Sequence, residues 1–243
     1  MVAFDVLWLS TNPSLKRFDL PMINYLSNSV RIGIWEYKQD LDEGSCIEKT
    51  VVLLYDFIKS SNHKFHLIGH GINGAIALLF ARSYPQRVQT LTLLSVAYQT
   101  GYTWHVYYYN KRYLLNISRE RALIHTAQTL FGNQVKDYSL NSLILSIDMD
   151  LDQAPSHHSL YKTMSLAPGN VDVPLMVCSS KNDAILTDAE LGGWSKILKP
   201  GDIFWQCESG NHFFHFFFPE KTGKNILNFW RNHYPDILQK LSF

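Results

Sequence analysis

The chain has 243 residues, of which 46% are hydrophobic and 18% are charged, and its formal net charge at pH 7 is +1. A chain of this length forms one large domain or two small ones and buries a sizeable core. The near-neutral charge provides no broad basic field, which argues against nucleic acid as a partner. No apolar run approaches the roughly 20 residues of a membrane-spanning helix, so we expect no membrane span.

Strands and helices are predicted to alternate over most of the chain. Apolar periodicity and turn residues predict, in chain order, strand 2–10, helix 20–27, strand 30–35, helix 47–59, strand 65–68, helix 75–84, strand 88–96, strand 173–179, helix 186–198, strand 203–207 and helix 220–234. The opening segment lacks a basic start and a small-residue cleavage site, so we interpret it as a strand and not as a signal peptide. The alternation predicts an α/β fold with a mostly parallel central sheet and helices on both faces.

The stretch 99–168 interrupts this alternation, because it is aromatic at first and helical in pattern afterwards. We interpret it as a helical cap insertion in one domain, between an N-terminal core part, 1–98, and a C-terminal core part, 169–243. Aromatic residues gather at its start and again at 213–218. Most of them are expected to pack in the core. The others are candidates for lining a site for a small apolar or acyl ligand, or for forming a homodimer or protein interface.

The three cysteines, Cys46, Cys178 and Cys207, are widely spaced and odd in number. Such a set favours a reducing, cytoplasmic environment over a disulfide framework. The pairs His157–His158 and His212/His215 are possible metal ligands, but neither has a third ligand nearby in the sequence. We therefore predict no metal and no cofactor.

A strand-to-helix turn follows the apolar run 65–68, with the sequence Gly69-His70-Gly71-Ile72-Asn73-Gly74. Small or turn-tolerant residues are needed here because a sharp turn brings backbone segments close together. The string also fits the G-x-G-x-x-G pattern of dinucleotide-binding proteins. However, it is not in the first strand–helix unit, and no acidic residue ends the next strand, so nucleotide binding is disfavoured.

This turn resembles the nucleophile elbow of the α/β-hydrolase superfamily, whose pattern is small-x-nucleophile-x-small. The resemblance extends over nearly the whole chain outside 99–168, and it implies the α/β-hydrolase fold. Gly71 occupies the nucleophile position, which is therefore vacant. Because glycine has no side chain, acyl-enzyme chemistry at this position is impossible.

The same resemblance assigns the other two members of a hydrolase triad. The loop after strand 173–179 carries Asp183 at the family's acid position, and the loop after strand 203–207 carries His212 at its histidine position. Taken alone, Asp183 is equally suited to an Asx turn, and His212 to a structural role. Asp188 is a rival acid that is better placed as a helix cap, and His215 is expected to pack or to face solvent.

The predicted oxyanion loop is altered. Ser10 and Thr11 stand where the family has His-Gly, and Asn12-Pro13 matches a subset of it. By this analogy the backbone N–H groups of Asn12 and Ile72 are the oxyanion donors. Ser10 is a candidate substitute nucleophile, although a loop-stabilising role suits it better. The C-terminal third is also weakly similar to type II thioesterases, which have their histidine in a run like 211–214.

Three explanations of the vacant position follow. The protein is a non-hydrolytic ligand-binding or scaffold member that retains the Asp183–His212 pair, which is the hypothesis we favour. Alternatively, it is an ester or thioester hydrolase in which that pair activates water. The third explanation, an engineered Ser→Gly variant, is disfavoured by the accompanying change at Ser10-Thr11.

Overall fold

A computed structural model of the chain describes residues 4–11, 13–38, 40, 42, 44, 46–132, 138–156, 166–168 and 170–235. Its centre is a six-stranded sheet with the order β2-β1-β3-β4-β5-β6. The strands are β1 (Val6–Ser10), β2 (Ile32–Glu36), β3 (Phe65–His70), β4 (Val88–Leu94), β5 (Leu175–Ser180) and β6 (Ile203–Cys207). Every neighbouring pair is parallel, which confirms the predicted fold class.

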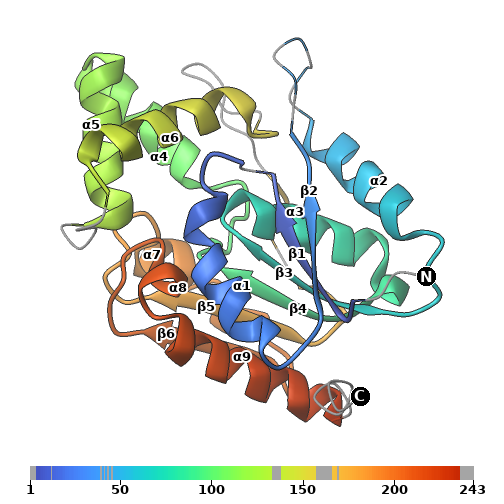
Figure 1. Ribbon diagram of the computed structural model, residues 1–243. Coiled ribbons are helices and arrows are strands. Elements are labelled where there is room, and N and C mark those ends of the chain that lie inside the picture. The colour runs from blue at the N-terminus through green and yellow to red at the C-terminus, as the bar shows by residue number, and fades with distance from the viewer. Residues whose placement is uncertain are drawn as a thin grey trace.

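Helices cover both faces of the sheet (Figure 1). They are α1 (Leu20–Ser27), α2 (Ile47–Ile58), α3 (Ile72–Ser83), α4 (Trp104–Leu115), α5 (Arg119–Phe131), α6 (Leu140–Gln153), α7 (Asp188–Leu191), α8 (Phe214–Phe217) and α9 (Pro219–His233). Helices α1 and α9 pack together against one face, and α2 and α3 against the other. None of the helices in the described ranges is both long and apolar enough to cross a membrane.

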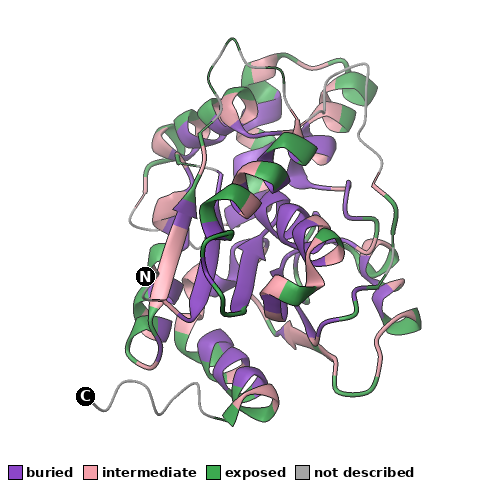
Figure 2. Ribbon diagram, turned by 90° about the vertical axis from the view of Figure 1, so that its right-hand side faces the viewer, coloured by how far each residue is buried: buried purple, intermediate pink, exposed green. Residues whose placement is uncertain are grey.

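The four inner strands, β1, β3, β4 and β5, are buried on both faces because their side chains alternate between two cores, whereas the edge strands β2 and β6 are mostly half-buried (Figure 2). In β1, Leu7 and Leu9 face the core beneath α2 and α3, whereas Val6 and Trp8 face the core beneath α1 and α9. This pattern explains why the strands read as continuous apolar runs in the sequence.

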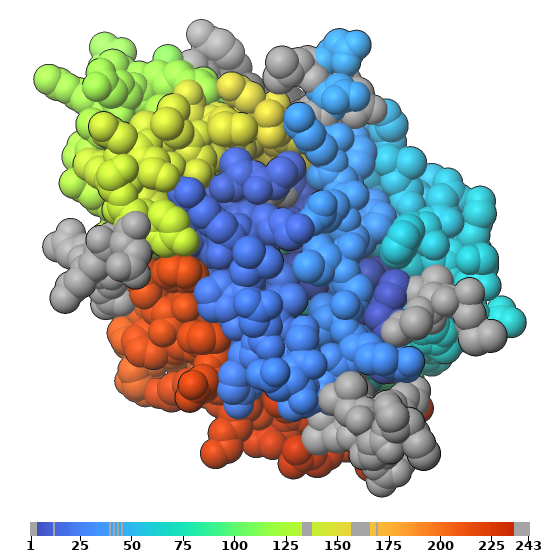
Figure 3. Space-filling view, in the orientation of Figure 1, coloured from blue at the N-terminus to red at the C-terminus, as the bar shows by residue number. Residues whose placement is uncertain are grey.

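Helices α4, α5 and α6 form a three-helix segment between β4 and β5 in the chain. Figure 3 shows it gathered at one end of the molecule, against N-terminal and C-terminal segments. A buried pair, His105 Nε2 and Asp150 Oδ2 at 3.1 Å, joins α4 to α6. Ser118 and Ser139 cap α5 and α6, since each side chain accepts a hydrogen bond from a backbone N–H of the first turn.

One predicted helix, 186–198, is wrong as a continuous element. The chain forms the short helix α7 and then a 3-10 turn, Trp194–Lys196. A Cβ at Gly193 would lie 2.0 Å from the ring of Tyr98, so the chain passes this ring only because the residue is glycine. The N-cap of α7 is Thr187, and Asp188 is its first residue.

Candidate functional site

The turn at Gly71 joins the end of β3 to the start of α3. Gly71 is the N-cap of α3, with φ 54° and ψ −121°, a conformation that residues with side chains rarely adopt. Its N–H donates to the carbonyl of Leu94 at 2.9 Å, which fixes the turn to the end of β4. The backbone thus makes a sharp strand-to-helix turn at a glycine, at the place where the sequence predicts the elbow.

Asp183 and His212 meet at the carboxyl ends of β5 and β6. His212 Nδ1 lies 2.9 Å from Asp183 Oδ2, and both side chains are almost completely buried. The other carboxylate oxygen, Oδ1, accepts the N–H groups of Ile185 at 2.8 Å and Leu186 at 3.1 Å. Asp183 therefore closes an Asx turn and orients the imidazole at the same time.

Burial alone would raise the pKa of the Asp183 carboxyl. The imidazole of His212 and the two backbone N–H groups lower it more strongly, so the net pKa lies below the ordinary value. Asp183 is consequently a carboxylate at neutral pH, the form that holds the Nδ1–H tautomer of His212.

The backbone of His212 is held by two donors. Its carbonyl accepts from Ser95 Oγ at 2.8 Å and from His70 Nε2 at 3.0 Å. The other end of the imidazole, Nε2, is buried and has no hydrogen-bond partner among the described residues. A Cβ built at Gly71 would lie 3.8 Å from this nitrogen, so the imidazole is positioned toward the vacant side chain.

Asn73, two residues after Gly71, occupies part of the predicted oxyanion side. Its Oδ1 accepts the N–H of Thr11 at 2.8 Å and the hydroxyl of Thr11 at 2.6 Å. Ile72, a predicted oxyanion donor, is buried at the start of α3. The other predicted donor, Asn12, lies outside the described residues. The loop after β1 is thereby tied to the first turn of α3.

A small cavity of about 10 Å³ lies beside Gly71, close to the minimum size for one water molecule. Its described lining residues are Leu15, Asp19, His70, Gly71, Ile72, Asn73, Trp104 and Phe213. Neither His212 nor Ser10 is among them. Ser10 ends β1 and lines a separate pocket with Pro13, Glu36, Tyr37 and Lys38. The cavity does not provide preformed space for an acyl chain.

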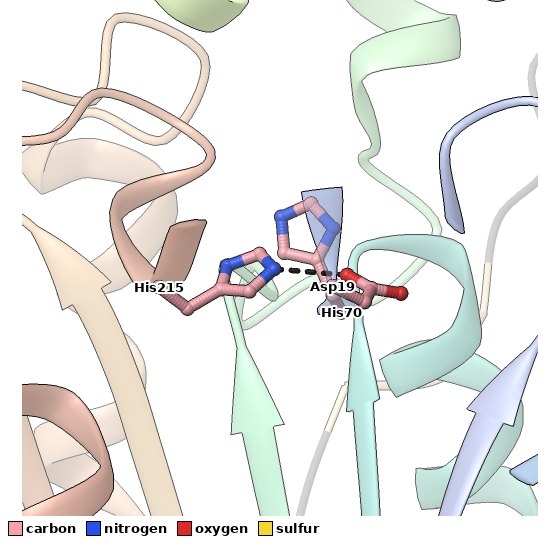
Figure 4. A group of neighbouring side chains, drawn as sticks. All are labelled: Asp19, His70 and His215. Carbon is pink, nitrogen blue, oxygen red and sulfur yellow. Dashed lines mark hydrogen bonds and ion pairs between the residues drawn. The ribbon is translucent and has the colours of Figure 1, made fainter. Parts of the chain in front are cut away.

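A second buried cluster lies next to this cavity and was missed by the sequence analysis (Figure 4). His215 Nε2 lies 2.9 Å from Asp19 Oδ1, and Trp8 Nε1 donates to Asp19 Oδ2 at 3.1 Å. The rings of His70 and His215 have centroids 4.5 Å apart. Asp19 precedes α1, His70 ends β3 and His215 is in α8, so only the fold brings them together.

Burial dominates the electrostatics of this cluster. It raises the pKa of Asp19 to about 6, against the opposing effects of His70 and of the hydrogen bond from Trp8. It lowers the pKa of His215 to about 3, with His212 contributing in the same direction. It also places the pKa of His70 well below its ordinary value, with smaller contributions from His215 and His212. At pH 7 the two imidazoles are therefore neutral beside a carboxylate.

The remaining candidates lie elsewhere. His157 and His158 are outside the described residues, and Asp188 is exposed in the first turn of α7. Cys178 and Cys207 are buried thiols, whereas Cys46 caps α2 through its sulfur. His215 is fully buried and is hydrogen-bonded to Asp19. Of the two alternatives predicted for it, packing or facing solvent, the second is therefore wrong.

The substitution Asp183→Asn should lower the free energy of unfolding by about 1–3 kcal/mol at pH 7, because it replaces the acceptor of the buried His212 Nδ1–H. Since the native pKa of Asp183 is lowered, the contribution of its carboxylate is complete above the ordinary value of 3.8 and is lost as the pH falls. Urea unfolding at pH 7 and pH 3 measures this. The exposed control Asp188→Asn should change stability by less than about 0.5 kcal/mol. If Asp183→Asn lowered the free energy of unfolding equally at pH 7 and pH 3, this would contradict the assignment of Asp183 as the carboxylate partner of His212.

No family model matches the chain. It is 47% identical over 227 residues to an uncharacterized protein, alr2406, of Nostoc sp. (strain PCC 7120), covering 93% of this chain and 90% of that protein. It is 35% identical to an uncharacterized protein, sll0249, of Synechocystis sp. (strain PCC 6803), with the same coverage of both chains.

Solved structures show the fold. A serine hydrolase involved in carbazole degradation, CarC, matches with a TM-score of 0.69 and 15% identity, over 95% of this chain and 92% of that one. Carboxylesterase CesB of Bacillus subtilis matches with a TM-score of 0.68 and 16% identity, over 96% and 85%. These similarities establish the α/β-hydrolase fold, and at such identities they establish the fold alone.

Proposed function

This chain belongs to the family of the Nostoc and Synechocystis proteins and has the α/β-hydrolase fold, and we propose that it is a non-hydrolytic member that serves a binding or scaffold function. The observation that supports a non-hydrolytic function most strongly is the glycine at the predicted nucleophile position, Gly71. It has the backbone conformation of an elbow and lies next to an oriented His212, yet it offers no nucleophile.

The closed surroundings of the elbow support the same proposal. The cavity beside Gly71 has a volume of about 10 Å³ and is bounded by Trp104 and Phe213, so the structure holds no preformed pocket for an acyl chain at this position. Asn73 accepts the N–H and the hydroxyl of Thr11, so the loop after β1 is tied to the first turn of α3 by internal contacts. These features favour a structural use of the Asp183–His212 pair over turnover.

A binding function would then depend on the outer surface. The three-helix segment exposes apolar side chains that the fold leaves uncovered, in contrast to the buried aromatic residues at its start, Trp104 and Tyr108. Its exposed apolar side chains are Tyr113, Leu114, Leu115, Leu140, Leu145 and Met149. A protein interface on this segment, either with a second copy of the chain or with another protein, agrees better with the structure than an internal acyl site.

One observation favours the second candidate function, an ester or thioester hydrolase with altered mechanism. His212 Nε2 is buried, has no partner among the described residues and lies on the side of the missing Gly71 side chain. A water molecule at that position would be the nucleophile in place of the serine hydroxyl. His212 would remove its proton as the general base, and the Asp183 carboxylate would orient the imidazole. Such general-base catalysis contributes about 10²–10⁴-fold.

One assay separates the two candidates. The purified protein and its His212→Ala variant are compared with p-nitrophenyl esters of short and long acyl chains and with an acyl thioester. The proposal predicts equal rates for the two proteins. Turnover by the wild type that falls at least about 100-fold in His212→Ala would overturn it and establish the hydrolase. The variant Val52→Ala, on the exposed surface of α2 and outside the three-helix segment, is the matched control.

A further inference from the structure

We propose that Asp19, His70 and His215 form a binding site for one divalent transition-metal ion of the Zn²⁺ type. The site lies beside the vacant elbow and is separate from the Asp183–His212 pair. The proposal does not depend on whether that pair is catalytically silent, because it concerns different side chains.

The donor set has the composition of known zinc sites. Each of the three residues contributes one nitrogen or oxygen atom, and these atoms lie within 4.8 Å of one another. Two imidazoles and one carboxylate are a common ligand set for zinc, with donor atoms about 2.0–2.2 Å from the ion. In tetrahedral geometry these donor atoms lie about 3.3 Å from one another. Small side-chain rotations are enough to bring the three donor atoms from their present separations to this distance. All three residues are buried, so the ion would be shielded from solvent.

Outer hydrogen bonds orient two of the ligands. The Nε2 of His70 lies 3.0 Å from the carbonyl of His212, and because a carbonyl only accepts, this nitrogen carries the proton. The lone pair of His70 is therefore on Nδ1, the nitrogen left for a cation. The indole of Trp8 donates to Asp19 Oδ2, which leaves Oδ1 as the inner oxygen. Backbone carbonyls and other outer partners orient metal ligands in this way.

Hydrogen bonding alone gives an incomplete account of the cluster. His215 has Nε2 near Asp19 Oδ1, while its Nδ1 is buried without a hydrogen-bond partner in the described part of the chain. An unsatisfied buried polar atom costs about 1–3 kcal/mol. The 2.9 Å contact between His215 Nε2 and Asp19 Oδ1 needs a proton between the two atoms, and an ion bound by both atoms would take the place of that proton.

The cavity beside Gly71 provides the fourth position. Asp19 and His70 both line it, together with Gly71. Its volume of about 10 Å³ is close to that needed for one water or one ligand atom on an ion held by three protein ligands.

Metal binding by the full-length protein tests the proposal without any activity assay. The protein is dialysed against a chelator and titrated with Co²⁺, which reports tetrahedral coordination by its visible absorption, and Zn²⁺ is then added as a competitor. We expect one Co²⁺ per chain, displaced by Zn²⁺. Asp19→Asn and His215→Gln should each weaken binding by at least about 100-fold, and Trp8→Phe by about 10–100-fold as the loss of an outer partner.

His66→Gln is the matched control, because His66 is a buried histidine that bonds to Thr90 Oγ1 at 2.9 Å and is not in the cluster. It should bind Co²⁺ like the wild type, and circular dichroism establishes that each variant is folded. Wild-type protein that binds no stoichiometric Co²⁺ would overturn the proposal. So would equal affinities in the wild type, Asp19→Asn and His215→Gln. Because the readout is absorption and not turnover, this test and the ester assay fail independently.

Discussion

The variant Gly71→Ser is expected to react with a fluorophosphonate probe at one serine per chain, whereas the wild-type protein should not react at this position. The Cβ of the new side chain would lie 3.8 Å from His212 Nε2, and its hydroxyl extends beyond Cβ into hydrogen-bond reach. The Asp183–His212 pair would then act as the base of a complete triad. Ester hydrolysis should rise at least about 100-fold above the wild type, as expected from general-base catalysis. Mass spectrometry of the labelled peptide measures the reaction of the new serine with the fluorophosphonate probe.

Two further variants make this prediction specific. Gly71→Ala has the same backbone strain at φ 54°, about 1–3 kcal/mol, but no hydroxyl, so it should remain unlabelled. The double variant Gly71→Ser/His212→Ala retains the hydroxyl and loses the base, so labelling should fall toward the wild-type level. If the folded Gly71→Ser variant does not react, His212 is not positioned to act on this side chain. Because Ser10 and Thr11 stand where the family has His-Gly in its oxyanion loop, the variant should remain slower than a hydrolase with that loop intact.

Gly69→Ala should be among the most destabilising single-methyl additions in the protein. A Cβ at Gly69 would lie 2.6 Å from the backbone C and O of Asn73, and these helix atoms cannot move aside as a flexible side chain would. We expect the free energy of unfolding to fall by about 3 kcal/mol, at the upper end of the effects of overpacking. In a domain of this size that loss lowers Tm by about 6–12 °C. Thermal unfolding followed by circular dichroism measures it.

Gly44→Ala is the control for this prediction, because a Cβ at Gly44 has no atom within 4 Å. Its effect should stay within about 0.5 kcal/mol. Similar stability of the two variants would show that the elbow tolerates a larger separation of β3 and α3, and that glycine at position 69 is not required by packing.

The sequence was sufficient for the sheet and for the contact of one pair of candidate site residues, Asp183 and His212, because their signals are local. Each buried strand is an apolar run between turn residues, so the strands were predicted within a few residues of their observed bounds. The acid and histidine loops directly follow β5 and β6, and the carboxyl ends of parallel strands meet at one edge of the sheet. The meeting of Asp183 and His212 therefore followed from chain order. The helix predicted at 186–198 is interrupted at Gly192 and Gly193, because consecutive glycines weaken a helix and α7 ends there.

By itself, then, the sequence determined the α/β architecture, the glycine at position 71 of the strand-to-helix turn and the loops that carry Asp183 and His212. Only the tertiary structure decided what surrounds the elbow. Asp19 and His215 are separated by 196 positions and belong to segments with no common motif, yet they are 2.9 Å apart. Thr11 and Asn73 are likewise joined across 62 positions. Such contacts arise because packing of helices on both faces of a sheet brings distant segments together, and the energies that favour them depend on burial, which a local pattern of residues does not encode.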